Sequence, residues 1–239
     1  MLANWKPDHA SQEVVAGKLK GTRFLSSSIK EYWVLEAMRP IERFCANTSL
    51  TPNAISLIGF GLTVVAAICL ATDHLVWGGW FVIWSGCCDF LDGRIARIKG
   101  MQSQSGAFLD SVLDRYMDFA ALIGLAIYFS DTVWVYFVYL ALLGTSTTPY
   151  IKAKSESLGI ESSGGEMQRP ERIVILGVGA LLSGYMMCLT YPFLNKGSEL
   201  PPYLLILGVI VVAYASNKVA LERFLQTFRL LQANDSKSK

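Results

Sequence analysis

The sequence reads Asp89-Phe90-Leu91-Asp92-Gly93-Arg94-Ile95-Ala96-Arg97 and, eight residues later, Gly106-Ala107-Phe108-Leu109-Asp110-Ser111-Val112-Leu113-Asp114. An unpaired ionised carboxylate inside a membrane costs at least about 2.5–3.5 kcal/mol, so four of them in apolar surroundings need compensation. Spacings of three and four residues put each pair of aspartates on one face of a helix. Two facing helices would aim all four carboxylates at one point, which predicts a divalent metal site.

The composition around this stretch indicates an integral membrane protein. The 239-residue chain is 52% hydrophobic and 17% charged, whereas soluble domains average about 25% charged residues. A membrane helix needs about 20 predominantly apolar residues to cross about 30 Å of hydrocarbon. We therefore predict an all-α integral membrane protein with six transmembrane helices, near residues 55–72, 74–91, 106–129, 132–151, 173–194 and 203–225.

The segments outside the predicted spans divide the chain into three parts. Residues 1–50 are predicted to form a cytoplasmic N-terminal arm and a juxtamembrane amphipathic helix, which would lie in the membrane interface or pack on the bundle. They contain no apolar run resembling a cleaved signal peptide, so we expect insertion through the chain's own spans. Residues 51–232 would form the six-helix transmembrane catalytic domain, with Thr51 as N-cap and Pro52 as first helical residue. Residues 233–239 are predicted to be a disordered polar tail.

Basic residues crowd into alternate connections between the spans. Arg94, Arg97 and Lys99 follow the second span, whereas the connection before it carries only Asp73 and His74. By the positive-inside rule, this asymmetry places both termini and the aspartates on the cytoplasmic side. We therefore expect a multi-pass protein of the cell (inner) membrane.

Elementary electrostatics favours two divalent ions at the aspartates. Four carboxylates in a low dielectric cannot all stay ionised without counter-charge, and Mg²⁺ or Mn²⁺ suits an all-oxygen site that also holds phosphates. Ion pairs with Arg94, Arg97 and Arg115 are the alternative, but they would leave negative charge unmatched. Gly93 and Ala96 leave room for a planar base, and Arg97 offers a fork for phosphate. Gly106 would let the two helices approach closely.

The pattern resembles the signature of the CDP-alcohol phosphotransferases (CDP-alcohol phosphatidyltransferases), D-x-x-D-G-x-x-A-R-x8-G-x3-D-x3-D, and every position is matched here. At about 5–8% usage per residue type, six matches at the required offsets from Asp92 would occur by chance roughly once in 10 million. The resemblance extends to chain length, to the six spans and to Thr51-Pro52-Asn53. It therefore covers most of the molecule.

The resemblance implies an enzyme of phospholipid biosynthesis. It would transfer the phosphatidyl group of CDP-diacylglycerol to the hydroxyl of a polar alcohol and release CMP. The implied metal ligands are Asp89, Asp92, Asp110 and Asp114, and Asp114 would alternatively be the general base that takes the acceptor's proton. The implied nucleotide and diphosphate site comprises Asn53, Gly93, Ala96, Arg97 and Gly106. The resemblance also implies a homodimer, with membrane lipid around it and no nucleic-acid partner.

A second basic group predicts where the acceptor's phosphate binds, and it comprises Lys152, Lys154, Arg169 and Arg172. Pro170 near a helix start would place both arginines at an N-terminus suited to anions.

The chain resembles the branch of the family that makes phosphatidylinositol phosphate or related lipids. That branch tends to carry S-Y-x-K-A-R-A-E and then R-x-E-R, and this chain reads Pro149-Tyr150-Ile151-Lys152-Ala153-Lys154-Ser155-Glu156 and then Arg169-Pro170-Glu171-Arg172. Pro149 replaces a hydroxyl, and Lys154 replaces an arginine whose planar fork it does not reproduce. Inositol 1-phosphate is the expected acceptor, and glycerol 3-phosphate is the alternative.

A divalent-cation transporter is the competing class of protein, because intramembrane carboxylates bind ions there too. Arg97 argues against it, since a cation path has no use for an arginine beside its ligands. Asp118 extends the acidic row by one helical turn outside the signature, and we expect it to form a hydrogen bond between helices. Gly59, Thr63 and Ala66 form a stripe of small residues suited to close helix contact, for example in a homodimer.

Overall fold

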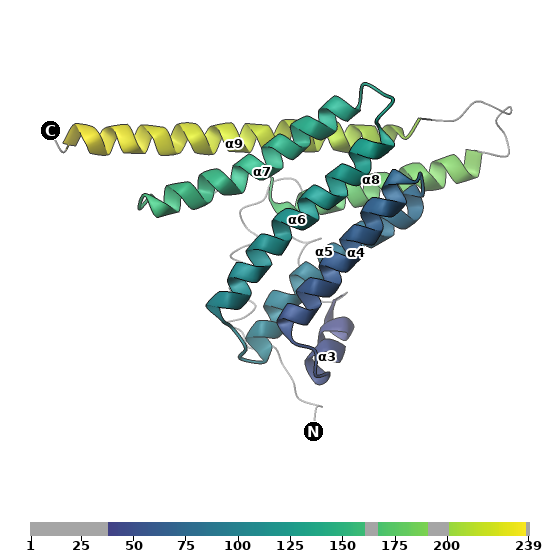
Figure 1. Cartoon of the computed structure of the whole chain (residues 1–239), viewed down its shortest axis with the longest axis horizontal. Coiled ribbons are helices and arrows are strands. Elements are labelled where there is room, and N and C mark those ends of the chain that lie inside the picture. The colour runs from purple at the N-terminus through teal and green to yellow at the C-terminus, as the bar shows by residue number, and fades with distance from the viewer. Residues whose placement is uncertain (1–37, 161–166, 191–200, 238–239) are drawn as a thin grey trace.

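The computed structural model describes residues 38–160, 167–190 and 201–237, and within these ranges every regular element is a helix (Figure 1). The helices are α3 (Arg39–Asn47), α4 (Pro52–Ala71), α5 (Leu75–Ile98), α6 (Gln104–Tyr128), α7 (Val135–Ser157), α8 (Arg169–Thr190) and α9 (Tyr203–Lys237). The all-α prediction is thus confirmed for the described residues. Most of the predicted N-terminal arm, residues 1–37, lies outside them.

Each of the six predicted spans corresponds to one helix, from α4 to α9. Three of them, α4, α8 and α9, are long and apolar enough to cross a membrane. The other three carry several charged residues in one half, such as Asp89 to Arg97 at the end of α5. Length and composition therefore support a membrane protein with three clear candidate spans among the described helices.

Hydroxyl side chains cap the starts of α4 and α6, and the first of these caps, Thr51, was predicted. Thr51 Oγ1 accepts a hydrogen bond from the Ala54 N–H at 3.3 Å, and α4 begins at Pro52 as expected. Ser103 Oγ caps α6 by accepting from the Gly106 N–H at 3.0 Å. Residues 99–103 connect α5 to α6. Ser103 therefore determines where α6, which carries Asp110 and Asp114, begins.

Two groups of helices make up the bundle. In Figure 1, α4, α5 and α6 form one inclined group, while α7 and α9 run together away from it. Helix α8 packs on both α5 and α9 and so joins the two groups. The α5–α8 contact is close, because a Cβ at Gly79 would lie 2.7 Å from the Gly177 carbonyl oxygen and the Leu181 nitrogen. This close approach brings the start of α8 to the acidic end of α5.

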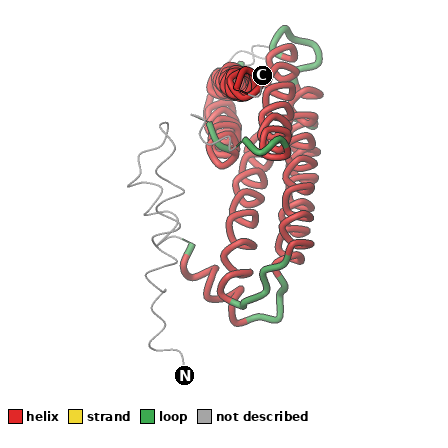
Figure 2. Tube along the Cα trace, turned by 90° about the vertical axis from the view of Figure 1, so that its left-hand side faces the viewer, coloured by secondary structure: helices red, strands yellow, loops and turns green. Residues whose placement is uncertain are grey.

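Helix α3 packs on the bundle beside the α5–α6 turn. Its Glu42 is 2% exposed and pairs with Arg94 of α5 at 2.7 Å. Lys99 Nζ donates to the carbonyls of Thr48 and Leu50, at 2.7 and 2.8 Å, and so ties the end of α5 to the segment between α3 and α4. Figure 2 shows the short helix α3 at the same end of the bundle as the loop between α5 and α6. Helix α3 thus packs on the bundle, and its placement in the membrane interface stays a prediction.

Three features differ from the sequence-based predictions. Helix α9 continues through Lys237, so the segment from residue 233 predicted to be disordered is helical that far, because extending an existing helix costs much less than starting one. Helix α7 continues to Ser157, past residue 151, where its span was predicted to end. The stripe Gly59, Thr63 and Ala66 is buried inside the subunit, where Thr63 hydrogen-bonds Ser85 of α5 at 2.5 Å, so it is not available to a second copy.

Candidate active site

Three of the four signature aspartates come together at one end of the bundle. Asp89 of α5 and Asp110 and Asp114 of α6 have carboxylate oxygens within 4.8 Å of one another. We call these three residues the acidic group. All three are partly buried, and the spacing of four along α6 puts Asp110 and Asp114 on the same helix face. The predicted convergence of carboxylates from two helices is therefore present for this group.

Asp92 lies beside the acidic group with a partner of its own. It is 5% exposed, and its Oδ2 accepts a hydrogen bond from Ser56 Oγ of α4 at 2.5 Å. It is close enough to Asp89 and Asp110 to interact with them electrostatically. Its assignment as a metal ligand stays a prediction. The sequence analysis did not single out Ser56, although it is a hydroxyl in an apolar run, three residues after Asn53.

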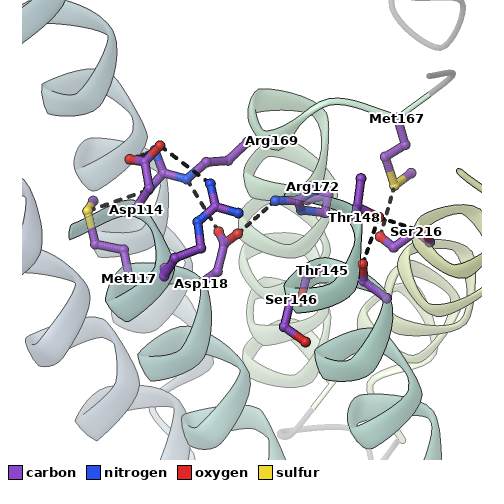
Figure 3. A network of polar contacts seen from close by, with 12 residues as sticks. Asp114, Met117, Asp118, Thr145, Ser146, Thr148, Met167, Arg169, Arg172 and Ser216 are labelled. Carbon is purple, nitrogen blue, oxygen red and sulfur yellow. Dashed lines mark hydrogen bonds and ion pairs between the residues drawn. The ribbon is translucent and has the colours of Figure 1, made fainter. Parts of the chain in front are cut away.

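Arg169 reaches the acidic group from the start of α8. Its Nη1 contacts Asp89 Oδ1. The same Nη1 lies 2.6 Å from Asp114 Oδ1, while Nε lies 3.4 Å from Asp118 Oδ1 (Figure 3). Arg172, one turn later, donates to Asp118 Oδ2 at 2.7 Å. Asp118 therefore bonds α6 to α8, which agrees with the predicted contact between helices. Arg169 was predicted to bind the acceptor's phosphate, and its contact with the aspartates was not predicted.

The start of α8 is built to hold Arg169 in place. Pro170 follows at the second helical position, and the Glu171 side chain accepts a hydrogen bond from the Gln168 N–H at 3.0 Å. A carboxylate three residues after the residue whose N–H it binds is half of a capping box. The side chain of Arg169 is only 10% exposed, so its charge acts where solvent screening is weak.

The arginines first considered as counter-ions are not the main partners of the acidic group. Arg94 is paired with Glu42 of α3, and Arg115 lies 3.9 Å from Asp114 at the edge of the group. The nearest positive charge comes instead from α8, more than fifty residues further along the chain. The spacing of residues within α5 and α6 does not indicate which residues of α8 lie beside them.

The predicted nucleotide-binding residues are all exposed or half-buried, and their role stays a prediction. Asn53, Gly93 and Arg97 are exposed, and Ala96 and Gly106 are half-buried. A Cβ at Gly106 would lie 3.3 Å from Asn53 Oδ1, so α4 and α6 meet there. A Cβ at Gly93 would have no atom within 4 Å, which leaves the open space expected for a planar base.

The predicted acceptor-binding residues fall into two places. Arg169 and Arg172 lie at Asp118, whereas Lys152 and Lys154 lie on the exposed end of α7, where Lys152 pairs with Glu156 at 3.8 Å. A further basic residue, Arg223 of α9, was not among the predicted site residues. Its Nη1 donates to the Thr148 carbonyl at 3.4 Å, and Arg172 acts on it electrostatically.

A small cavity of about 30 Å³ lies under the acidic group. Asp118, Arg169 and Arg172 line it on one side, and the hydroxyl residues Thr63, Ser85 and Thr145 are among the other residues around it. This volume corresponds to about one water molecule with several polar partners.

The donor set suits a hard divalent cation. The acidic group offers only carboxylate oxygens, which are the ligands that Mg²⁺ and Mn²⁺ prefer. Asp89, Asp110, Asp114 and Asp118 together face the two buried arginines of α8, so the region keeps an excess of negative charge. The residues present therefore fit metal ions of this class.

Comparisons with known proteins point to the same chemistry. The sequence model described as CDP-alcohol phosphatidyltransferase matches residues 49–214, which include all four signature aspartates and both arginines of α8. The chain belongs to the CDP-alcohol phosphatidyltransferase family. The transporter alternative is thereby left without support.

Two relatives of this CDP-alcohol phosphatidyltransferase are phosphatidylinositol phosphate synthases. The protein of Mycobacteroides abscessus is 35% identical over 150 residues, which cover 61% of this chain and 68% of the relative. That of Cutibacterium acnes is 35% identical over 154 residues, covering 62% and 74%.

Two solved structures of the Mycobacterium tuberculosis phosphatidylinositol phosphate synthase share the fold. The complex of that protein with manganese and citrate superposes with a TM-score of 0.67 at 29% identity, covering 79% of this chain and 88% of that chain. Its form with CDP-DAG bound gives a TM-score of 0.65 at 28% identity, covering 79% and 92%. This CDP-alcohol phosphatidyltransferase thus shares both sequence and architecture with enzymes of phospholipid synthesis.

Proposed function

We propose that the chain transfers the phosphatidyl group of CDP-diacylglycerol to a hydroxyl of inositol 1-phosphate and releases CMP. The observation that carries the proposal is the acidic group beside the two buried arginines of α8, on a chain whose relatives are phosphatidylinositol phosphate synthases. A site with oxygen ligands for cations and a neighbouring site with fixed positive charge matches a reaction between two phosphate-bearing substrates.

The residues of the signature and of the nucleotide site have different proposed roles. Asp89, Asp92, Asp110 and Asp114 would hold two Mg²⁺ or Mn²⁺ ions, which supply charge neutralisation at the diphosphate and at the leaving CMP. Asn53, Gly93, Ala96, Arg97 and Gly106 bind the cytidine and diphosphate. Asp114 takes the proton of the acceptor hydroxyl as that oxygen attacks the phosphorus bearing the lipid, and the bond from this phosphorus to CMP breaks.

Arg169 and Arg172 bind the phosphate of the acceptor, since a guanidinium fork matches phosphate oxygens. Lys152 and Lys154 add positive charge on the approach to the site, because they lie on exposed turns at the end of α7. The hydroxyl of neighbouring Thr148 lies 2.8 and 3.2 Å from the Gly144 and Ser216 carbonyls, so it does not replace the hydroxyl that Pro149 lacks.

Glycerol 3-phosphate is the second candidate acceptor. Pro149 and Lys154 depart from the pattern of the inositol branch, and both lie in the segment expected to contact the acceptor. Glycerol 3-phosphate carries a phosphate for the same arginines and requires fewer contacts to ring hydroxyls.

One assay tests the reaction and the acceptor together. Purified protein would be given CDP-diacylglycerol, Mg²⁺ or Mn²⁺ and, separately, inositol 1-phosphate, glycerol 3-phosphate, inositol or serine, with CMP and the lipid product measured by mass spectrometry. We expect CMP release with inositol 1-phosphate and formation of phosphatidylinositol phosphate. Turnover with serine or inositol but with neither phosphorylated alcohol would overturn the role given to the arginines.

We further propose that all six helices from α4 to α9 cross the cell (inner) membrane, as a catalytic domain of residues 51–232. Helices α5, α6 and α7 have 24, 25 and 23 residues, enough for about 30 Å of hydrocarbon at 1.5 Å per residue. Large apolar side chains are exposed on all six, including Ile68, Trp77, Ile123, Leu140, Leu182 and Leu207. Single cysteines at Asp73 and Asp131 should react with an impermeant thiol reagent from outside, in a background whose native cysteines are replaced.

The same topology places both termini and the acidic group on the cytoplasmic side, with α3 at the interface of that leaflet. A cysteine at Ser103, in the α5–α6 turn, should therefore be protected from the external reagent in intact cells and labelled after the membrane is opened. We also propose a homodimer, which cross-linking in native membranes would test.

A further inference from the structure

The Arg169 guanidinium and a bound cation require the same carboxylate oxygens. Arg169 Nη1 contacts the Oδ1 atoms of both Asp89 and Asp114, two members of the acidic group. A carboxylate oxygen that forms a close ion pair with an arginine is less available to a metal ion, and the positive charges of the arginine and the ion repel each other. Arg169 therefore competes with cations for the acidic group.

Asp118 offers Arg169 a second carboxylate outside the acidic group. It lies one helical turn beyond Asp114 on the same face of α6, with Oδ1 3.4 Å from Arg169 Nε. Its other oxygen, Oδ2, is held by Arg172 at 2.7 Å, and both side chains are largely buried. Asp118 is therefore a fixed anchor rather than a mobile surface group.

This arrangement links the cation site to the acceptor site. We propose that Asp118 is a positioning residue that retains Arg169 when its guanidinium leaves Asp89 and Asp114, so that the arginine makes way for cations and turns toward the acceptor's phosphate. The inference rests on the proposed function of the acidic group and of the arginines. Because linkage is reciprocal, cation binding then strengthens binding of the phosphorylated acceptor, and acceptor binding strengthens that of cations.

The proposal predicts opposite effects of two substitutions on cation affinity. Binding of Mn²⁺ alone to the full-length protein, without substrates, would be measured by the electron paramagnetic resonance signal of free Mn²⁺. Arg169→Met should tighten binding roughly 5- to 10-fold, and Asp118→Asn should weaken it by a similar factor, at the lower end of typical coupling between sites. The double variant should bind as tightly as Arg169→Met alone, because Asp118 acts through Arg169.

Arg115→Met is the matched control. It removes an equal charge that lies 3.9 Å from Asp114 but is about one-third exposed and outside the acidic group. We expect it to change Mn²⁺ affinity less than about twofold, since exposed charges are well screened. Asp118→Glu, which keeps the carboxylate, should restore affinity toward that of the unmodified protein. Thermal unfolding without metal identifies a variant that fails to fold.

Three results would overturn the inference. In the first, Arg169→Met leaves Mn²⁺ affinity unchanged or weaker. In the second, Asp118→Asn weakens binding equally with and without Arg169, as a purely long-range charge effect would. In the third, Asp118→Asn leaves the KM for the phosphorylated acceptor unchanged, where the proposal expects a rise larger than the fall in kcat. Absence of Mn²⁺ binding in the unmodified protein and in every variant would instead sink the proposed cation site itself.

Discussion

Two buried arginines of this protein contact acidic side chains in different ways. Arg94 of α5 pairs with one partner, Glu42 of α3, at 2.7 Å, and stacks over the Phe90 ring at 5.4 Å. Arg169 of α8 contacts three aspartates at once, two of them in the acidic group. Their side chains are similarly shielded, 12% and 10% exposed. Burial therefore does not distinguish the two arginines, but the balance of charge around them does.

The Arg94–Glu42 pair is balanced in charge, whereas the aspartates around Arg169 outnumber the positive charges there. The two arrangements have different consequences. One arginine against one carboxylate leaves no net charge and fixes α3 on α5, which is a structural task. Several carboxylates around Arg169 keep net negative charge at a partly buried position, which costs stability unless a ligand of opposite charge binds. Residues that trade stability for function in this way are typical of active sites.

The largest effect on activity is expected from removing a carboxylate of the acidic group. Asp114→Asn should reduce CMP release by about 100- to 10,000-fold, the range for loss of a general base. The same change should leave the melting temperature unchanged or raise it, because it relieves repulsion among like charges. Initial rates and thermal unfolding of the same preparation measure both. A fall in activity matched by a fall in melting temperature would contradict the assigned role.

Breaking the Glu42–Arg94 pair should have the opposite effect to Asp114→Asn, with a large loss of stability and little loss of activity. Glu42→Gln leaves Arg94 buried without its charge partner and should lower the free energy of unfolding by about 3 kcal/mol, with activity per folded molecule changed far less than in Asp114→Asn. Unfolding in denaturant measures it. The charge-reversed double variant, Glu42→Arg with Arg94→Glu, should recover part of the loss. If the double variant is less stable than either single one, the pair is not the source of the effect.

The sequence predicts the parts of this comparison that lie within one helix. Asp110 and Asp114 were expected together because four residues make about one turn, and Thr51 capped α4 as expected. Contacts between distant helices were not predictable. Arg169 reaches Asp89 because α8 packs closely on α5, and no spacing within either helix encodes that approach.

The same limit explains why the hydrogen bond between Asp92 and Ser56 was not predicted. Its spacing from Asp89 put it on the right helix face, but its hydrogen bond to Ser56 depends on how α4 lies against α5. Predictions from periodicity therefore identified the residue types and faces of the site, while the partners of each side chain came from tertiary packing.

The α5–α8 contact offers a way to disturb the Arg169 contacts without changing Arg169 itself. Gly79→Ala would place a Cβ 2.7 Å from backbone atoms of α8, and overpacking of this kind costs about 1–3 kcal/mol of stability. The displaced α8 should also raise the KM for the phosphorylated acceptor. Gly61→Ala is the control, because nothing lies within 4 Å of its Cβ position in α4. It should be neutral or stabilise by up to about 1 kcal/mol. Equal losses in both variants would show that any change in a helix has this effect.

The smallest effect is expected from the hydrogen bond that holds Asp92. Ser56→Ala removes the donor at 2.5 Å without adding bulk, and loss of a residue that orients a metal ligand typically weakens metal binding 10- to 100-fold. We expect the Mn²⁺ concentration for half-maximal activity to rise about 10-fold, with kcat at saturating metal changed much less. Ser111→Ala is the matched control, since that exposed hydroxyl donates to the Ala107 carbonyl within its own helix. If both serine variants shift the metal requirement equally, or neither does, then Asp92 is not a ligand held by Ser56. Asp92 would then be a buried residue that stabilises the fold, as Glu42 is, and not a metal ligand.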